Sequence, residues 1–340
     1  MKKSKNLLIV MSVLLIAVIF ITSLIKSGMK DASLSNYAMG SPVNIKVYGE
    51  RNGDDLCSSA FEQISFIDRT YFSHTTETSI ISTLNSEKEA MSLNSFSDYL
   101  HYCIELSEKS DCFTLFSGEL KDLWQIENGG YIPTDEEIAQ VLEKLSNASI
   151  KIENKTADLR VISISDGKLD LGALGKGAAC DEAINFLKQQ KVENALVTVG
   201  GSIGAIGKDP YKIGVRNPFG GQNDYFAILN VTNCFISTSG DYEKYFEKDG
   251  VRYCHIFDAK TGRPVQNDIT SVTVVADNGI LSDFLSTAIF CEGVPNGLKL
   301  AEEFHAKVII VKKDKSVLIS KALEEKITIN DDSFVVSVIE

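Results

Sequence analysis

The stretch Lys168-Leu-Asp-Leu-Gly-Ala-Leu-Gly-Lys-Gly177 links a strand-like segment, residues 168–171, to a helix expected over residues 175–190. Its glycines lie where the strand would turn into the helix. Such a junction lets backbone N–H groups approach a phosphate and points the helix N-terminus at its charge. The stretch is no Walker loop, because no Ser or Thr follows Lys176, and it is no GxGxxG fingerprint. Taken alone, it therefore predicts a structural turn.

Outward from this stretch, short strand patterns alternate with helical ones. Strands are expected at residues 43–48, 158–164, 195–199, 211–215, 225–231, 234–238 and 269–275. Helices are expected at residues 55–71, 97–107, 135–145 and 281–292, and Thr134-Asp-Glu-Glu137 supplies a cap for the third. This mixture predicts an α+β fold with a largely antiparallel sheet core and packed helices, not a doubly wound fold. Because no linker or repeat divides it, we expect one compact domain with at most two lobes.

The first thirty residues differ in composition from the rest of the chain. They hold five lysines and no acid, and an apolar stretch at residues 7–25 is interrupted only by serine and threonine. At about 1.5 Å per residue this stretch would reach ~28 Å, close to the ~30 Å hydrocarbon core of a bilayer. Residues 1–30 are therefore predicted to be a membrane anchor or a signal segment, and since the cleavage site is poor, an uncleaved single-pass anchor in the cell membrane is preferred over a cleaved signal. The body, residues 31–340, would then be extracytoplasmic.

Beyond this anchor the chain is strongly acidic. It has 34 basic and 46 acidic residues, and five of the basic ones lie in the first thirty, so the body carries a formal charge of −17. This charge argues against nucleic acid as a partner, and an anionic ligand would need a metal ion or locally placed cations. The seven cysteines include no CxxC pair, so we predict free thiols and no zinc site.

A second stretch, Ser282-Asp-Phe-Leu-Ser-Thr-Ala288, carries a carboxylate and a hydroxyl four residues apart. On a helix, Asp283 and Thr287 project from the same face. Hard oxygen ligands of this kind suit a magnesium ion that keeps positions open for phosphate oxygens. We interpret this stretch and the glycine-rich one as two halves of a metal site. In isolation, a first-turn acid followed by a buried threonine is an equally good interpretation.

His255 stands out among the four histidines of the chain, because the others lie in a polar loop and on expected helices. An imidazole with a pKa near neutrality can take a proton from an attacking hydroxyl. Asp258 follows it, just before a Thr261-Gly-Arg-Pro264 turn. This aspartate could orient the imidazole or bind a partner, or it could simply cap the turn.

Four motifs occur in the order and at the spacing of ApbE-type FAD:protein FMN transferases, and the chain resembles this family over roughly residues 37–325. The motifs are Asp170-Leu-Gly-Ala-Leu-Gly-Lys-Gly177, Ser237-Thr-Ser-Gly-Asp-Tyr242, His255-Ile-Phe-Asp-Ala-Lys-Thr-Gly-Arg-Pro264 and Ser282-Asp-Phe-Leu-Ser-Thr287. The resemblance implies an ApbE-like or T-fold-like architecture, with Mg²⁺ as cofactor and FAD as substrate. It also implies that FMN is attached through a phosphoester to a threonine hydroxyl of an acceptor protein, with release of AMP. Acceptors in the family are typically subunits of membrane redox pumps or surface flavoreductases.

The resemblance further implies roles for single residues. The metal would be held by Asp283, Thr287 and the main-chain carbonyl of Ala173, while His255 would activate the acceptor threonine with Asp258 nearby. The cofactor-binding residues would be Met39, Thr75, Cys112, Phe113, Thr114, Asp170, Lys176 and Phe257. Relatives commonly have Ala-Phe-Asp in place of Cys112-Phe-Thr114, and often an aromatic residue in place of Thr75. Arg216 and the Ser239-Gly-Asp-Tyr242 turn are also family positions, with a structural or an acceptor-binding role.

Two alternatives stay open at this point. The first is an FAD pyrophosphatase, in which water replaces the threonine and FMN is released free; this enzyme would also retain His255. The second is a non-catalytic FAD-binding protein, which the departures at Thr75 and Thr114 favour. A protein that only binds FAD would not need a histidine that activates a nucleophile, which argues against the second alternative.

Overall fold

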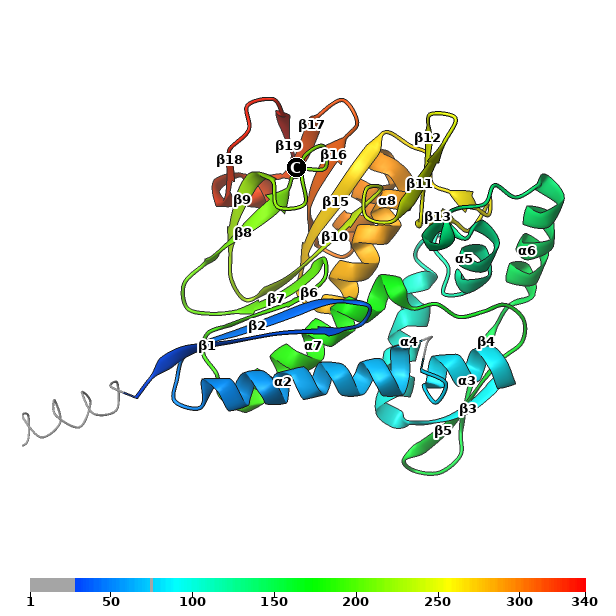
Figure 1. Cartoon of the computed structure of the whole chain (residues 1–340), viewed down its shortest axis with the longest axis horizontal. Helices are drawn as coiled ribbons and strands as arrows, with labels where there is room; N and C mark the ends of the chain where they lie inside the picture. The colour runs from blue at the N-terminus through cyan, green and yellow to red at the C-terminus, as the bar shows by residue number, and fades with distance from the viewer. Residues whose placement is uncertain (1–27, 74–75) are drawn as a thin grey trace, which may run out of the picture.

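The computed structural model describes residues 28–73 and 76–340, and a nine-stranded sheet lies at its centre (Figure 1). The strands run in the order β1-β2-β6-β7-β10-β15-β16-β17-β19. Neighbours in this sheet are antiparallel except β17 and β19, which are parallel. The predicted α+β fold with a largely antiparallel sheet is therefore confirmed.

The strands of this sheet are formed by apolar residues that alternate with polar ones or run continuously. They are β1 (Lys30–Ala38), β2 (Ser41–Glu50), β6 (Ala195–Val199), β7 (Ser202–Ile206), β10 (Cys234–Gly240), β15 (Ile269–Ala276), β16 (Lys307–Lys312), β17 (Ser316–Ser320) and β19 (Val335–Ile339). In β2, Val43 and Ile45 are fully buried and Lys46 is exposed, which is the pattern of a strand with one covered face. In contrast, β15 is buried along its whole length because both faces of the sheet are covered there.

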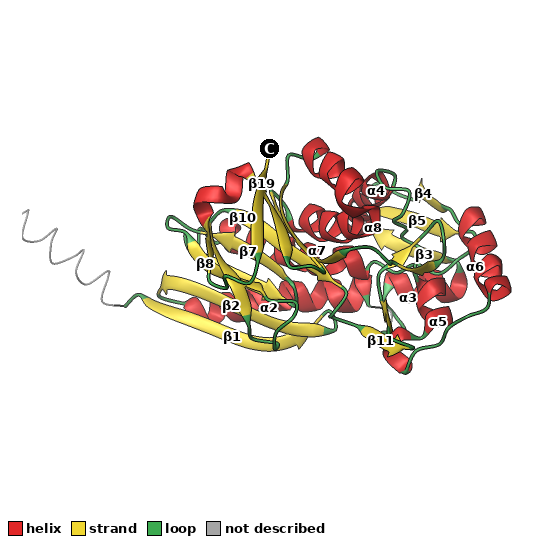
Figure 2. Ribbon diagram, turned by 90° about the horizontal axis from the view of Figure 1, so that it is seen from above, coloured by secondary structure: helices red, strands yellow, loops and turns green. Residues whose placement is uncertain are grey.

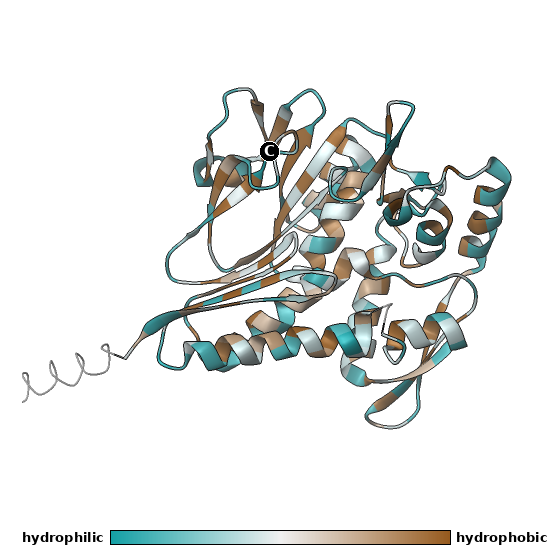
Figure 3. Cartoon of the chain, viewed as in Figure 1, coloured by the Kyte–Doolittle hydropathy of each residue, from teal (hydrophilic) through white to brown (hydrophobic). Residues whose placement is uncertain are grey.

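Three long helices cover one face of the sheet. In Figure 1, α2 (Gly53–Ile67) and α7 (Gly172–Gln189) lie along β1, β2 and β6, and α8 (Gly279–Glu303) lies against β10 and β15. Helix α8 is interrupted at Gly293, whose φ of 74° is not helical. The opposite face is covered by a small sheet of β18 (Ile327–Ile329), β9 (Tyr225–Val231) and β8 (Tyr211–Arg216). In Figure 3, brown apolar stretches follow the strands of the large sheet and teal residues gather on the loops.

The remaining elements form a second lobe beside the sheet, on the right in Figure 2. They are α3 (Ile80–Glu87), β3 (Glu89–Leu93), α4 (Asn94–Ser107), α5 (Gly118–Trp124), α6 (Asp135–Asn147), β4 (Ile150–Asn154), β5 (Leu159–Ile164), β11 (Tyr245–Lys248), β12 (Val251–Cys254), β13 (Phe257–Asp258) and β14 (Arg263–Pro264). The main apolar core continues from the sheet into this lobe, and a smaller core surrounds Trp124. The two lobes thus belong to one compact domain.

The prediction for the glycine-rich stretch is wrong in one respect. Residues 168–171 form no strand beyond a single bridge between Ser117 and Lys168, and α7 already begins at Gly172. The helix thus begins three residues earlier than expected, and Gly175 and Gly177 lie within its first turns. Their role is close packing, because a Cβ on Gly177 would lie 2.1 Å from the carbonyl oxygen of Gly279 on α8, and one on Gly175 would lie 2.8 Å from Met39 Cε.

Most other predicted elements are present, with their ends shifted by a few residues. The strands at residues 195–199 and 225–231 match β6 and β9, and the predicted cap of α6 is a complete capping box between Thr134 and Glu137. The helix predicted at residues 55–71 ends as α2 at Ile67, and a π-helical turn, Asp68–Phe72, follows it. All seven cysteines are free thiols.

The predicted membrane anchor, residues 1–30, lies outside the described residues up to residue 27. Among residues 28–73 and 76–340, no helix is both long enough and apolar enough to cross a bilayer.

Candidate active site at the contact of α7 and α8

Helices α7 and α8 approach each other so closely that only glycine fits at the crossing. A Cβ on Gly177 or on Gly279 would lie 2.1 Å from the carbonyl oxygen of the other residue. Beside them Asp181, which is 9% exposed, accepts hydrogen bonds from the amides of Gly279 (2.7 Å) and Ile280 (2.9 Å) and so caps the first turn of α8. Burial raises the pKa of Asp181 to about 6. We call this region the α7–α8 contact.

Asp283 is the buried acid of the α7–α8 contact. It is 3% exposed, and its Oδ2 accepts a hydrogen bond from the Gly177 amide (2.9 Å). Its Oδ1 accepts one from the Ser202 hydroxyl (3.1 Å), and the Lys176 ammonium lies 3.7 Å from Oδ2. The structure therefore brings together the two stretches that sequence analysis paired. Ser202 was not among the predicted site residues, although the preceding Gly200-Gly201 pair marks a tight turn there.

Two further oxygens lie near Asp283. One turn along α8, the half-buried Thr287 hydroxyl lies 3.0 Å from the Ser239 hydroxyl of β10 and 3.4 Å from the Asp283 carbonyl. The main-chain carbonyl of Ala173, the third expected ligand, belongs to the first turn of α7, the helix whose Gly177 amide donates to Asp283. A carboxylate, a hydroxyl and a carbonyl thus form a set of hard oxygen donors. In the part of the chain that the structure describes, no three His, Cys, Asp or Glu side chains gather into a metal-binding group.

Asp170, just before α7, is held by a lysine that sequence analysis did not identify. Its carboxylate pairs with the ammonium of Lys121 on α5 and accepts a hydrogen bond from the Gly172 amide at 2.7 Å. Lys121 lies 49 residues earlier in the chain, and no motif in the sequence links it to Asp170. The Asp170 amide also donates to the Leu115 carbonyl (2.8 Å), which ties the preceding loop to the site.

This loop contains the predicted cofactor-binding residues Cys112, Phe113 and Thr114. The Cys112 carbonyl accepts a hydrogen bond from the Ala259 amide at 2.9 Å. Phe113 packs edge-on against Phe284 of α8 with ring centroids 5.0 Å apart, while the Thr114 hydroxyl accepts a local bond from the Phe116 amide. The loop therefore bridges α8, next to Asp283, and the β13–β14 hairpin.

His255 directly follows β12 and faces the same site. Its amide and its Nδ1 lie 3.0 Å and 3.2 Å from the Lys244 carbonyl oxygen. Because a carbonyl only accepts, Nδ1 carries the proton and the lone pair of Nε2 remains available. His255 is half-buried, and this burial, together with the charges of Lys121, Lys244 and Lys176, lowers its pKa to about 4. The histidine is therefore neutral at pH 7, within electrostatic reach of the lysines that pair with Asp170 and Asp283.

Asp258 and Phe257 are held by contacts of their own. Asp258 Oδ1 accepts a hydrogen bond from the Lys260 amide (2.8 Å) and Oδ2 accepts one from the Thr261 hydroxyl (3.2 Å), so this carboxylate caps the turn of the β13–β14 hairpin. Among the described residues, no hydrogen bond joins it to His255. Phe257 is 7% exposed and packs in the small core around Trp124.

Met39 lies at the turn between β1 and β2, with a φ of 55° and its amide bonded to Asp68 Oδ2 at 2.7 Å. Its side chain reaches Gly175, so it borders the first turns of α7. Thr75, also predicted as a cofactor-binding residue, lies outside the described residues. The structure thus brings most of the predicted residues to one place, the first turns of α7 and α8 and the loops facing them.

The chain is similar to proteins of a known family. The model of the ApbE family matches residues 39–310. A curated FAD:protein FMN transferase of Klebsiella pneumoniae is 29% identical over 294 residues, covering 85% of this chain and 91% of the relative. One of Vibrio cholerae is 32% identical over 240 residues, 68% of this chain and 67% of the relative. The crystal structure of the ApbE protein of Thermotoga maritima superposes with a TM-score of 0.77 at 28% identity, covering 87% of this chain and 99% of that one.

Proposed function

The chain belongs to the ApbE family, and from this premise we propose that it is a magnesium-dependent FAD:protein FMN transferase. It moves FMN from FAD to a threonine hydroxyl of an acceptor protein. The threonine oxygen forms a bond to the phosphorus of the FMN half, the bond from that phosphorus to the oxygen shared with AMP breaks, and AMP leaves. The observation that carries the proposal is that Lys176 lies 3.7 Å from the buried Asp283, while burial and the charges of Lys121, Lys244 and the same Lys176 lower the pKa of His255. A neutral base and a buried acid therefore belong to one site.

The α7–α8 contact has the donor set that magnesium prefers. The ion would be held by Asp283, Thr287 and the carbonyl of Ala173, all of them hard oxygens. The Ala173 carbonyl belongs to the first turn of α7, the helix whose Gly177 amide donates to Asp283. When bound, magnesium neutralises negative charge on the FAD pyrophosphate. Lys176 and Lys121 add local positive charge in a body whose formal charge is −17.

His255 acts as the general base on the acceptor threonine. Its Nδ1 proton is directed at the Lys244 carbonyl, so Nε2 takes the proton from the threonine hydroxyl. With a pKa of about 4, the imidazole carries this lone pair at neutral pH. An anionic substrate would offset the lysine charges that lower the pKa of His255, which makes the imidazole a stronger base when FAD is bound. Asp170, Cys112, Phe113 and Met39 surround the same site and would bind FAD.

The proposal includes a place in the cell. Residues 1–30 would anchor the enzyme in the cell membrane with its catalytic body outside the cytoplasm, where redox-pump subunits or surface flavoreductases would be its acceptors. The apolar stretch at residues 7–25 supports this placement.

The test uses the full chain in detergent with FAD, Mg²⁺ and an acceptor domain that the Vibrio cholerae relative flavinylates. Mass spectrometry is expected to find FMN covalently attached to the acceptor, and chelation of Mg²⁺ should abolish the attachment. His255→Ala should lower the transfer rate by about 10²–10⁴-fold without changing FAD binding, because only the base is lost. The matched control is His101→Ala, which removes an exposed histidine from α4.

Two other outcomes of this experiment would support the pyrophosphatase or the FAD-binding protein instead. Release of FMN and AMP without an adduct, while the Vibrio cholerae enzyme modifies the same domain, would indicate an FAD pyrophosphatase. FAD that stays bound and intact would indicate a binding protein. Equal transfer by the His255→Ala variant would remove His255 from the mechanism.

A further inference from the structure

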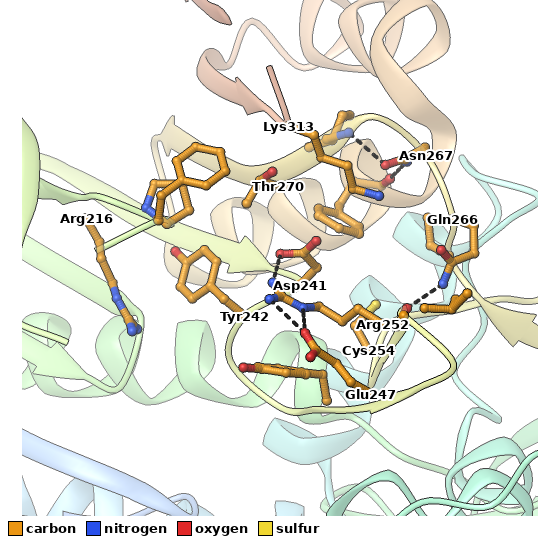
Figure 4. Close-up of a pocket in the computed structure, with 18 of the residues that line it drawn as sticks. Arg216, Asp241, Tyr242, Glu247, Arg252, Cys254, Gln266, Asn267, Thr270 and Lys313 are labelled. Atoms are coloured by element: carbon orange, nitrogen blue, oxygen red, sulfur yellow. Dashed lines mark hydrogen bonds and ion pairs between the residues drawn. The ribbon is translucent and has the colours of Figure 1, made fainter. Parts of the chain in front are cut away.

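A cavity of about 750 Å³ lies beside the β11–β12 hairpin, and the reaction described above makes no use of it (Figure 4). Elements from both lobes line it, including the ends of β8, β10 and β16. The polar residues that define it here are Arg216, Asp241, Tyr242, Arg252, Thr270 and Lys313. We call it the Lys313 cavity.

The β11–β12 hairpin forms one wall of the Lys313 cavity. Glu247 and Arg252 pair across the hairpin and line the cavity. Their neighbours Phe246 and Tyr253 face the other way, because side chains alternate along a strand. These two rings stack with centroids 4.9 Å apart, and Tyr253 also stacks on Trp124. One face of the hairpin is therefore packed into the small core, while the other is open to the cavity.

Of the three basic side chains that line the cavity, Arg216, Arg252 and Lys313, the first two are held in ion pairs. Arg252 already engages both carboxylates of the lining, Asp241 at 3.3 Å and Glu247 at 3.1 Å. Arg216 pairs with Glu243 at 2.9 Å. Lys313 is exposed, and within residues 28–73 and 76–340 no ion pair of its ammonium is present. In a body with a formal charge of −17, this is a local site for an anionic group.

Two buried polar atoms of the lining residues lack a hydrogen-bond partner. Thr270 is 3% exposed, and its hydroxyl has no hydrogen-bond partner in the described part of the chain. The Nε atom of Arg216 is also buried and has no hydrogen-bond partner there. Buried polar groups are nearly always satisfied in folded proteins, so an orphaned one calls for an explanation. Both atoms can donate to oxygen. Together with the Lys313 ammonium, they indicate a ligand rich in oxygen acceptors.

The position and the rim of the cavity favour a polypeptide over a small anion. Phe219, Tyr245 and Val251 line the cavity and are 44%, 41% and 40% exposed, which offers apolar contacts that a small anion would not use. Cys254, also in the lining, directly precedes His255. His255 alternates to the other face of the hairpin from Cys254, and since an extended chain advances about 3.3 Å per residue, a segment anchored in the cavity would need only a few residues to pass round the end of the hairpin to the imidazole.

We propose that the Lys313 cavity binds an acidic segment of the acceptor protein and so presents the acceptor threonine to His255. This inference rests on the proposed transferase function. A carboxylate of the acceptor pairs with Lys313, backbone carbonyls accept from the donors of the lining, and apolar side chains cover the rim. The cavity thus sets which proteins are modified, and the α7–α8 contact carries out the transfer.

The test compares Lys313→Glu with Lys312→Glu in the full chain, using the acceptor domain named above. Lys312 is the matched control, because it is the neighbouring lysine, pairs with Asp268 at 2.7 Å and does not line the cavity. Lys313→Glu is expected to raise KM for the acceptor by at least about tenfold while kcat and the Kd for FAD stay within twofold. Lys312→Glu should leave all three unchanged. Thr270→Val, which keeps the side-chain shape, should also raise KM for the acceptor.

A charge exchange gives the sharper result. If an acidic residue of the acceptor pairs with Lys313, changing that residue to Lys should weaken modification by the wild type and restore it with Lys313→Glu. An unchanged KM in Lys313→Glu would overturn the proposal, and so would a loss of FAD affinity, since the cavity would then hold a small anion. Failure of the wild type to transfer FMN would instead overturn the proposed function. Fluorescence anisotropy can measure how tightly the acceptor binds in the absence of FAD, which tests the cavity independently of the transfer reaction. Equal acceptor affinity of the wild type and of Lys313→Glu would reject the proposed role of the cavity.

Discussion

The two halves of the site are built in different ways. At the α7–α8 contact, glycine backbones touch, and the buried acids Asp181 and Asp283 have donors to both of their oxygens. The half that carries His255 consists of two short two-stranded sheets, β11–β12 and β13–β14, which lie outside the large sheet and pack on a small core. The half that would bind phosphate is thus fixed by the main core, while the half that would receive a protein partner is peripheral. Substitutions at the α7–α8 contact should therefore lower the free energy of unfolding, and substitutions in the two hairpins should lower activity.

The strongest test of this contrast is Gly177→Ala. The new methyl group would lie 2.1 Å from a backbone oxygen of Gly279, which cannot move without separating α7 from α8. Overpacking of this kind costs about 3 kcal/mol, whereas the better helix propensity of alanine returns only about 1 kcal/mol. We expect the free energy of unfolding, measured by urea denaturation, to fall by about 2 kcal/mol.

The matched glycine in the hairpins is Gly250, at the turn between β11 and β12. Nothing lies within 4 Å of a Cβ there, and only its φ of +77° opposes a side chain. Gly250→Ala should therefore cost about 1 kcal/mol from backbone strain. If Gly177→Ala were no more destabilising than Gly250→Ala, the α7–α8 contact would not be the rigid half of the site.

The same glycine shows where prediction from sequence stops. Alternation within one segment predicts β6 and β9, and a local capping box predicts the start of α6, because these signals lie within a few residues of each other. The spacing of Asp283 and Thr287 is local in the same sense. Gly177 resembles a turn glycine until its partner Gly279, about a hundred residues away, is known. Lys121 beside Asp170 and the Lys313 cavity depend on such long-range contacts too, so no pattern in the sequence reveals them.

A further effect concerns the dependence of stability on pH, which should have opposite signs in the two halves. Burial raises the pKa of Asp181 to about 6, above its value of about 4 in the unfolded chain. The folded state therefore binds the proton more tightly, and this stabilisation, complete below about pH 4, is lost as pH rises through 6. The Asp181→Asn variant does not titrate at this position. Relative to it, the free energy of unfolding of the wild type should fall by about 1–3 kcal/mol between pH 4 and 7. Urea denaturation at several pH values measures this difference.

His255 provides the opposite sign. Its folded pKa of about 4 lies below the unfolded value of about 6.5, so its contribution is present above pH 6.5 and is lost as pH falls through 4. Relative to His255→Ala, the wild type should therefore become less stable on acidification. In the wild type the two trends oppose each other, and only the paired variants separate them. If the difference in stability between the wild type and each variant changed with pH in the same direction for both variants, the two halves would not differ in their pH dependence.

The smallest effect is expected for Asp258→Asn, which asks whether the hairpin carries a second functional acid next to His255. In the structure both carboxylate oxygens are used by the turn, one by the Lys260 amide and one by the Thr261 hydroxyl. An asparagine keeps an acceptor for the Lys260 amide, and its NH₂ group can donate to Thr261, so the cost should stay below about 1 kcal/mol. The rate of FMN transfer should then remain within about twofold of the wild type. A fall of tenfold or more at unchanged stability would show that Asp258 orients His255 or holds the acceptor, and the periphery of the site would then be as finely arranged as its core.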